Sequence, residues 1–244
     1  MTVTEDRLLN GQVILRQGAG GYRAGVDAAL LAAACAAKPG QGVLEAGCGP
    51  GGAMLAAARR RPGVAFTGVE RDLNALALAQ ENIALNGLQD RVSAIAGDVV
   101  APFKALGLAP FDAAMANPPY FDDPTAIRGP APAKTGAWIA DGGLAAWLGF
   151  LLSAVREGGT MTIIHRADRL GDILAGLAPK AGSFQVLPVH AFADAPAKRV
   201  LVRAVKTGKA PLQLLPALVL HAPGGAHSPQ AESILRGQAA IEWP

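Results

Sequence analysis

The chain alternates between two patterns of apolar positions. Short apolar runs bounded by glycine or charged residues predict buried strands, whereas longer alanine- and leucine-rich runs with apolar residues three to four apart predict helices. The predicted strands are 13–15, 43–45, 64–69, 92–96, 111–116, 160–164, 184–189, 200–205 and a strand-like run at 214–220. The predicted helices are 28–37, 52–61, 73–85, 144–157, 168–177 and a short one after Ser228.

This alternation predicts an α/β fold with a doubly wound parallel sheet. Strands that alternate with helices are joined by right-handed crossovers, and the short connection between 184–189 and 200–205 favours an antiparallel hairpin. A length of 244 residues, of which 51% are hydrophobic, suits one substantial core. We expect a single domain over 1–244, divided into an N-terminal cover over 1–41, a core over 42–205 and a C-terminal extension over 206–244.

Several polar residues are expected to act on the ends of helices. Asp27 is expected to cap the helix 28–37 rather than to contact a ligand, and Asp72 is expected to cap the helix that ends at Asn86-Gly87. The run Arg59-Arg60-Arg61 ends the helix 52–61, where cations suit the helix dipole, so we interpret it as a helix terminus and not an RNA contact. Trp147 and Phe150 are expected to pack in the core.

Four polar residues, Glu45, Glu70, Asp98 and Asn117, fall at the ends of successive predicted strands. Parallel sheets bind their ligands beyond the carboxyl ends of the strands, so these residues are expected to line one edge of the sheet. A carboxylate at any one strand end could simply cap the next helix. Three carboxylates and an asparagine at successive strand ends favour a binding site.

The turn Gly47-Cys48-Gly49-Pro50-Gly51 follows the first central strand and opens a helix. Its glycines permit positive φ and allow a ligand to approach the backbone. Glu70 lies nineteen residues after Gly51, at the end of the next strand, where a carboxylate could hold ribose hydroxyls. The spacing indicates an adenosine-type cofactor.

Composition narrows the function classes. The longest apolar segment without a charge, 142–155, is too short to span a bilayer, and the first residues are too polar for a secretory signal, so we expect a cytoplasmic protein without a membrane partner. Cys35 and Cys48 suggest no disulfide framework, and no histidines pair at ligand spacing, so no metal is expected. A net charge of +3 is compatible equally with a polyanionic partner and with an ordinary basic surface.

The tetrapeptide Asn117-Pro118-Pro119-Tyr120 carries the chemistry. The prolines restrict the backbone, so the Asn117 side-chain carbonyl and the Pro118 main-chain carbonyl can both accept from one amino group. Holding both hydrogens favours the geometry in which the nitrogen lone pair points outward, towards an electrophile. The ring of Tyr120 offers a face for a planar substrate. The long segment 121–143 that follows is rich in proline and glycine and is interpreted as an active-site loop.

Glu45-Ala46-Gly47-Cys48-Gly49, Glu70, Gly97-Asp98 and Asn117-Pro118-Pro119-Tyr120, in this order, resemble the class I S-adenosylmethionine-dependent methyltransferases that act on amino groups. The opening segment 11–34 and the tail around 218–236 resemble bacterial tRNA (adenine-N6)-methyltransferases, which modify the anticodon-loop adenosine at position 37 of valine tRNA. The resemblance covers nearly the whole chain and implies a Rossmann-like, seven-stranded sheet. It also implies S-adenosylmethionine as cofactor and tRNA as partner.

The resemblance also implies residue roles. Glu45 would lie near the amino group of the cofactor, Gly47 and Gly49 beside its methionine part, Glu70 at its ribose hydroxyls and Asp98 at its adenine amino group. Asn117, which also borders the cofactor, and Pro118 would hold the target amine, with Tyr120 stacking on the base. Pro50 departs mildly from the expected glycine turn and puts only the loop contacts in doubt.

Alternatives remain open from the sequence. A glutamine side-chain amide in a protein would suit the same tetrapeptide, although such enzymes resemble this domain preceded by a larger helical domain, and here 42 residues precede the first central strand. Guanine N2 in ribosomal RNA, adenine in DNA, and a non-catalytic protein that binds the cofactor or RNA are further alternatives. A nicotinamide dehydrogenase is less well supported, because the sequence offers no convincing proton donor for hydride transfer.

Overall fold

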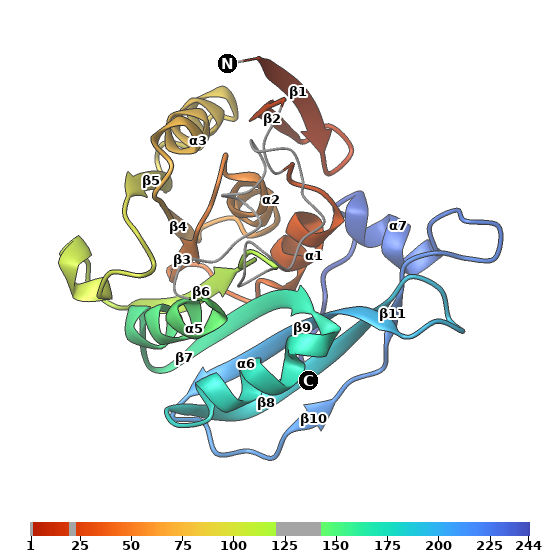
Figure 1. Ribbon diagram of the computed structural model, residues 1–244. Helices are drawn as coiled ribbons and strands as arrows, with labels where there is room; N and C mark the ends of the chain where they lie inside the picture. The colour runs from red at the N-terminus through yellow and green to blue at the C-terminus, as the bar shows by residue number, and fades with distance from the viewer. Residues whose placement is uncertain (1, 20–22, 121–142) are drawn as a thin grey trace.

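The computed structural model describes residues 2–19, 23–120 and 143–244 of the 244-residue chain (Figure 1). The strands are β1 (Val3–Leu8), β2 (Val13–Gly18), β3 (Gly42–Ala46), β4 (Ala65–Glu70), β5 (Val92–Ala96), β6 (Phe111–Ala116), β7 (Val155–Arg166), β8 (Ala181–His190), β9 (Ala197–Lys206), β10 (Gln213–Leu214) and β11 (Leu218–Val219). The helices are α1 (Val26–Ala34), α2 (Gly52–Arg60), α3 (Leu73–Leu85), α5 (Gly143–Ala154), α6 (Leu170–Leu177) and α7 (Pro229–Leu235), with short 3₁₀ helices η1 (Phe103–Leu106) and η4 (Ala167–Arg169).

The central sheet has the order β10-β8-β9-β7-β6-β3-β4-β5, with β11 also paired to β8. Strands β5, β4, β3, β6 and β7 are parallel neighbours, and β9 runs antiparallel between β7 and β8. The doubly wound α/β prediction and the antiparallel terminal hairpin are therefore confirmed. The described sheet has nine strands rather than seven, because β10 and β11 extend its β8 edge by two residues each.

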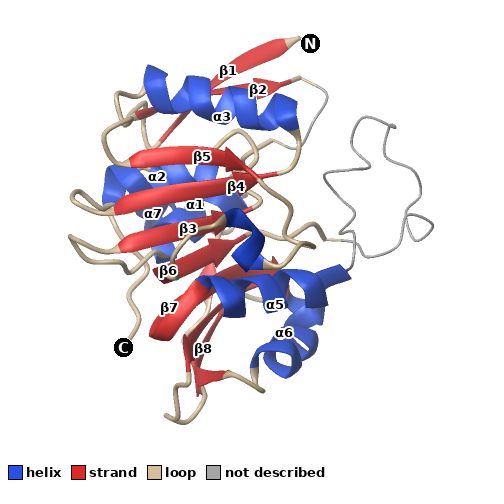
Figure 2. Ribbon diagram, turned by 90° about the vertical axis from the view of Figure 1, so that its left-hand side faces the viewer, coloured by secondary structure: helices blue, strands red, loops and turns tan. Residues whose placement is uncertain are grey.

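Side chains that alternate along each strand build two hydrophobic layers. Val43 and Ile164 pack with α1, α2 and α3 on one face, whereas their neighbours Leu44 and Ile163 pack with α5 and α6 on the other. This period of two is what a sheet covered on both sides requires. Figure 2 shows the two helix groups on either side of the strands. Trp147 and Phe150 lie in the second layer, as predicted.

The N-terminal hairpin β1–β2 is attached to α3 by two buried asparagines. Asn86 accepts from the backbone N–H of Ile14 at 2.9 Å and donates to the carbonyl of Ile14 at 2.7 Å. Asn82 accepts from the N–H of Arg16 at 2.8 Å and donates to the carbonyls of Arg16 and Pro50, both at 2.9 Å. The two amides therefore satisfy backbone groups of β2, and one of them also reaches the glycine turn. The sequence analysis predicted β2 only as 13–15 and missed β1.

Several predicted element ends need correction. Helix α1 begins at Val26, its N-cap is Gly25 without a side-chain cap bond, and the prediction that Asp27 caps this helix is wrong. Strand β7 starts at Val155 instead of residue 160 and contains an irregularity, where Gly158 has φ of 74°. The run 214–220 is divided between β10 and β11.

Other element ends match the predictions. The Asp72 side chain caps α3 by accepting from the N–H groups of Asn74 and Ala75. The arginine run at the end of α2 is structural: Arg59 donates to the carbonyl of Asn86 and Arg61 to that of Cys35. Arg60 donates to carbonyls in the C-terminal segment. The interpretation of this run as a helix terminus is thus confirmed.

Candidate active site

The four predicted rim residues come from adjacent strands. Glu45 lies near the end of β3 and Glu70 ends β4, while Asn117 and Asp98 follow β6 and β5 by one and two residues. Ala46 of β3 is paired in register with Ala116 of β6 and with Val69 of β4. The glycine turn and Asn117 therefore leave the sheet side by side. The structure brings the predicted residues to one edge.

Glu45 is buried, with 3% of its surface exposed. Burial raises the pKa of its carboxyl well above the usual range; a hydrogen bond from the backbone of Met54 opposes this rise and the charge of Glu70 adds to it. Among the described residues, the Oε2 atom of Glu45 has no hydrogen-bond partner. A buried carboxylate oxygen without a partner is costly unless a cation or donor reaches it. The site is therefore suited to a positively charged group.

The glycine turn provides both close packing and open space. Gly47, Gly49 and Gly51 have φ of 64°, 54° and 90°, the left-handed region that favours glycine. A β-carbon on Gly47 would lie 2.3 Å from the ring of Trp147, whereas one on Gly49 would meet no atom of the described residues within 4 Å. Gly47 thus permits packing of α5, and Gly49 borders space that a ligand can use.

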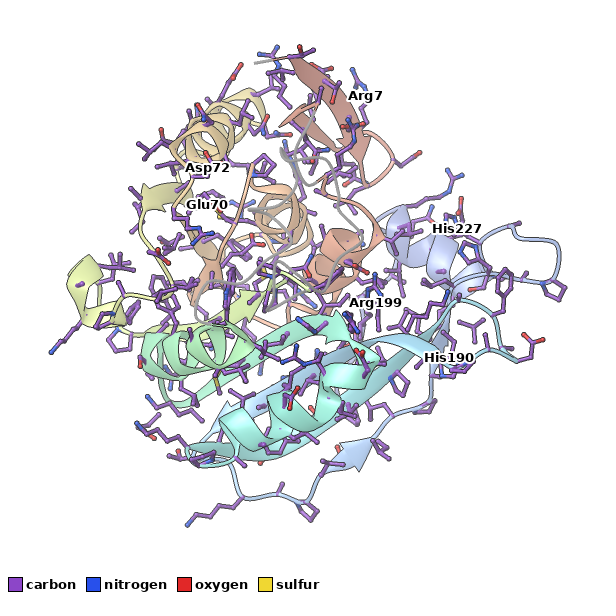
Figure 3. The ribbon with its side chains drawn as sticks, in the orientation of Figure 1. Arg7, Glu70, Asp72, His190, Arg199 and His227 are labelled. Carbon is purple, nitrogen blue, oxygen red and sulfur yellow. The ribbon has the colours of Figure 1, made fainter. Side chains whose placement is uncertain are left out.

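Glu70 connects two backbone segments at the rim. Its Oε2 accepts from the N–H of Gly49 and its Oε1 from the N–H of Asp72, both at 2.8 Å. Glu70 therefore fixes the turn relative to α3; Figure 3 shows Glu70 and Asp72 together. Asp98 accepts from the N–H of Val100 at 2.9 Å, which orders the segment after β5.

The segment 117–120 is held from β7. Pro118 is buried, and Asn117 is partly exposed. The carbonyl of Pro119 lies 3.3 Å from Nε2 of the buried His165, and the carbonyl of Tyr120 accepts from Arg166 at 3.5 Å. Contacts from the neighbouring strand, added to the stiffness of two prolines, give Asn117 and Pro118 a fixed position. The predicted loop 121–143 lies outside the described residues except for Gly143.

Tyr120 is 9% exposed, and its side chain contacts neighbouring parts of the fold. Its hydroxyl donates to Oδ2 of Asp27, its ring meets that of His165 edge-on at 5.5 Å, and the Cζ atom of Arg199 lies 4.6 Å from its centroid. Arg199 Nε also donates to Asp27 at 3.1 Å. The ring is therefore held by α1 and β9, and its stacking on a base stays a prediction.

Neither Arg199 nor His165 was predicted from the sequence, and Asp27 was predicted as a helix cap. Burial lowers the pKa of Arg199, but the charges of Asp27 and Tyr120 and hydrogen bonds to them prevail and raise it. Asp27 and Arg199 are 172 positions apart, and no local pattern connects them. Arg23, just ahead of α1, binds Asp6 and Thr4 on β1.

The sheet order, the glycine turn and the acidic rim define a class I methyltransferase architecture, the type that uses S-adenosylmethionine. Residues 22–128 match the family model of the methyltransferase small domain. The chain therefore carries a methyltransferase domain of this type, and the resemblance noted from the sequence is confirmed at this level.

Three known proteins illustrate the similarity. A release factor glutamine methyltransferase of Moorella thermoacetica is 33% identical over 162 residues, 62% of this chain and 56% of the relative. A tRNA1(Val) (adenine(37)-N6)-methyltransferase of Aeromonas salmonicida is 32% identical over 110 residues, 45% of each chain. The crystal structure of a predicted O-methyltransferase from Agrobacterium tumefaciens has a TM-score of 0.74 and 25% identity, covering 88% of this chain and 98% of that one. The matched region spans about half the length of the two relatives known by sequence.

The residues at the rim fit S-adenosylmethionine. Within the described part of the chain, the Oε2 atom of Glu45 has no hydrogen-bond partner and suits an ammonium group, and the space beside Gly49 admits a ligand against the backbone.

Among the residues described, no helix is long and apolar enough to cross a bilayer. Within the same residues, no three histidine, cysteine or acidic side chains are arranged to hold a metal ion.

Proposed function

We propose that the protein transfers a methyl group from S-adenosylmethionine to the exocyclic N6 amine of an adenine in tRNA. The observation that carries this proposal is the register between Ala46 and Ala116. It places the glycine turn, where the cofactor would lie, beside Asn117 and Pro118, which would hold the acceptor. Donor and acceptor sites on adjacent strand ends are what a direct transfer requires, because alignment of the reacting atoms supplies much of the rate.

The cofactor would be held by the rim residues. Glu45 would accept from its ammonium group, Gly47 and Gly49 would lie along its methionine part, and Asn117 would border it. Glu70 and Asp98 would accept from its ribose hydroxyls and adenine amino group. In this arrangement Glu70 has to share its oxygens with the two backbone N–H groups that it already binds, which is possible because each carboxylate oxygen offers two lone pairs.

The acceptor amine would be activated by orientation. The Asn117 side-chain oxygen and the Pro118 carbonyl would accept its two hydrogens, so that the nitrogen lone pair points away from the base plane. When bound, S-adenosylmethionine supplies an electrophilic methyl carbon on a sulfonium. The chain's own residues hold the amine and keep its lone pair directed at the cofactor side of the rim. The target base has to be unpaired or swung out of its stack, since a duplex hides the amine.

The similarity to tRNA (adenine-N6)-methyltransferases supports a tRNA acceptor, with the adenosine at position 37 of valine tRNA as the expected site. The net charge of +3 is compatible with that choice.

The second candidate is a glutamine side-chain amide in a release factor, favoured by the similarity to glutamine methyltransferases. An amide nitrogen would satisfy Asn117 and Pro118 equally well.

The test is to supply the purified protein with methyl-labelled S-adenosylmethionine and, separately, unmodified tRNA and release factors. We expect label in tRNA, recovered as N6-methyladenosine by mass spectrometry of nucleosides. Label in a release factor alone would support the second candidate. Label in neither would refute both acceptors.

A further inference from the structure

Three aromatic rings lie together at the β8 end of the active-site rim, and two of them are stacked. The rings of His221 and His227 have centroids 5.2 Å apart with an angle of 19° between their planes, whereas those of Phe192 and His221 are 5.4 Å apart and tilted by 37°. His221 is therefore the middle ring of the three. Phe192 is 40% exposed and the His227 side chain 37% exposed. We call Phe192, His221 and His227 the ring stack.

Topology places the ring stack on the same rim as Asn117. Strand β8 is parallel to β7 because both are antiparallel to β9, and β11 is parallel to β8. The segments after β8 and β11, which carry Phe192 and His221, therefore leave the sheet at the edge where β3, β4 and β6 also end. The N–H of His221 donates to the carbonyl of Ala191 at 2.9 Å and holds the two segments together.

A cationic side chain lies between the ring stack and the candidate acceptor site. Arg199 is paired in register with Val189, three residues before Phe192, and its guanidinium lies over the ring of Tyr120. Lys198, the preceding residue, is exposed. Figure 3 shows Arg199, His190 and His227 on the same side of the molecule. The order along the rim is thus Asn117 and Tyr120, then Arg199, then the ring stack.

Hydrogen bonds close the loop that bears the two histidines. Ala222 donates to the carbonyl of Ala226 and Ser228 to that of Leu220, both at 2.9 Å, and the Ser228 hydroxyl donates to the carbonyl of Val219. Phe192 leaves 40% of its surface exposed although it is aromatic. Exposed rings are suited to binding planar groups, since every nucleobase has a face that stacks on an aromatic ring.

We propose that the ring stack binds an unpaired nucleobase of an RNA strand whose target adenine enters the site at Asn117, with Lys198 and Arg199 near the intervening phosphates. This inference rests on the proposed function for its choice of partner. RNA fits better than an apolar peptide because Lys198 and Arg199 lie beside the ring stack, and surfaces that bind single strands combine aromatic rings with cations. The carboxylate of Glu232 is already occupied by His227 and Arg236, which reduces its repulsion of phosphates.

The test measures binding and stacking without turnover. The full-length protein and its variants are titrated into a short, unstructured oligouridine RNA that carries one 2-aminopurine, whose fluorescence is quenched on stacking. Phe192→Leu retains an apolar side chain without the ring, and His227→Gln removes an outer ring at the other end. Leu214→Ala is the control, because this 70% exposed side chain lies on β10, further back along β8.

We expect Phe192→Leu or His227→Gln to raise the Kd for the oligonucleotide about 5- to 150-fold, the range of one base stack, with loss of quenching. The control and the affinity for S-adenosylmethionine should be unchanged. Wild-type affinity and quenching in both ring variants would overturn the proposal, as would absence of RNA binding by the wild type. Binding of a tryptophan-containing peptide at the same rings, with no RNA binding, would identify a protein partner instead.

This proposal and the proposed function can fail separately. If the wild type binds the oligonucleotide through the rings but labels no adenine, the methylation proposal fails and the binding surface stands. If the wild type forms N6-methyladenosine in tRNA and Phe192→Leu and His227→Gln match its tRNA affinity and kcat/KM, the surface fails and the methylation proposal stands.

Discussion

The guanidinium of Arg199 lies over the ring of Tyr120, 4.6 Å from its centroid, while both side chains bind the same carboxylate oxygen of Asp27. These contacts connect Arg199 on β9 and Asp27 on α1 to Tyr120, the last residue of the tetrapeptide 117–120. Cation–π contacts of partly buried pairs contribute about 1 to 2 kcal/mol, and a hydrogen bond to a charged group about 1.5 to 3 kcal/mol. The ring plane of Tyr120 is therefore set by residues that no motif contains.

Tyr120→Phe removes the hydroxyl and retains the ring. We expect the free energy of unfolding to fall by about 1 to 3 kcal/mol, because the bond to Asp27 is lost. If the ring plane orients the substrate, kcat should fall while KM for S-adenosylmethionine stays unchanged. The measurement is denaturant unfolding together with steady-state kinetics of methyl transfer.

Arg199→Lys should produce a similar fall in kcat, since an ammonium lacks the planar face of a guanidinium. Unchanged kcat in both variants would remove the positioning role.

Asn117→Ala deletes one of the two proposed acceptors of the target amine. We expect methyl transfer to fall by about 100-fold or more, in the range found when one preorganised polar group is removed from an active site. The Kd for S-adenosylmethionine, measured by calorimetry, should change much less. Asn74→Ala, at an exposed asparagine of α3, is the matched control. Full activity of the Asn117 variant would refute its role in holding the amine.

Glu45→Gln tests the buried carboxyl. Its pKa is raised in the folded protein, so the folded state retains a proton that the unfolded state has released. The free energy of unfolding of the wild type should therefore fall as pH rises from the ordinary carboxyl range towards the raised pKa, and the Gln variant should lack this dependence.

The check on Glu45 is urea unfolding across that pH range, with the exposed Glu242→Gln as control. The Gln variant should also bind S-adenosylmethionine more weakly, since the partner of its ammonium group has lost its charge. Parallel pH profiles of wild type and Glu45→Gln would show that this carboxyl does not titrate as described.

Gly47→Ala and Gly49→Ala separate packing from ligand access. Both impose about 1 to 2 kcal/mol of backbone strain at positive φ. Only the first also places a methyl group 2.3 Å from the ring of Trp147, so it should lower the melting temperature more. Gly49→Ala should be comparatively stable but weaker in cofactor binding. Thermal unfolding and calorimetry with S-adenosylmethionine measure the two effects. Equal loss of stability in both variants would contradict the packing role of Gly47.

The sequence predicted the parts of the fold that depend on local pattern. Strands 92–96 and 111–116 match β5 and β6 residue for residue, because each is a compact apolar run between clear boundaries. The cap at Asp72 was predictable because it depends only on a capping residue directly before a helical pattern. Strand β1 was missed because its apolar residues are only Val3 and Leu8, at its two ends, and it forms by pairing with β2.

Prediction failed where a residue's partner is distant in sequence. Asp27 has the residue type and position of a helix cap, yet its oxygens are used by Tyr120 and Arg199, which only the fold brings near. The start of α1 has no side-chain cap bond. The rim residues were predictable because parallel topology alone places strand ends together, whereas the contacts of Glu70 with Gly49 and Asp72 required the coordinates.

Asn82 binds main-chain atoms of both Arg16 and Pro50, so the amide depends on where those residues lie and not on which side chains they carry. In a saturation mutagenesis experiment, position 82 should tolerate almost no replacement, although Asn82 touches no proposed substrate. Positions 16 and 50 should accept many replacements, because Asn82 binds only main-chain atoms there. Intolerance to replacement at this asparagine would then be an architectural signal, and taking it for a catalytic one would misplace the active site.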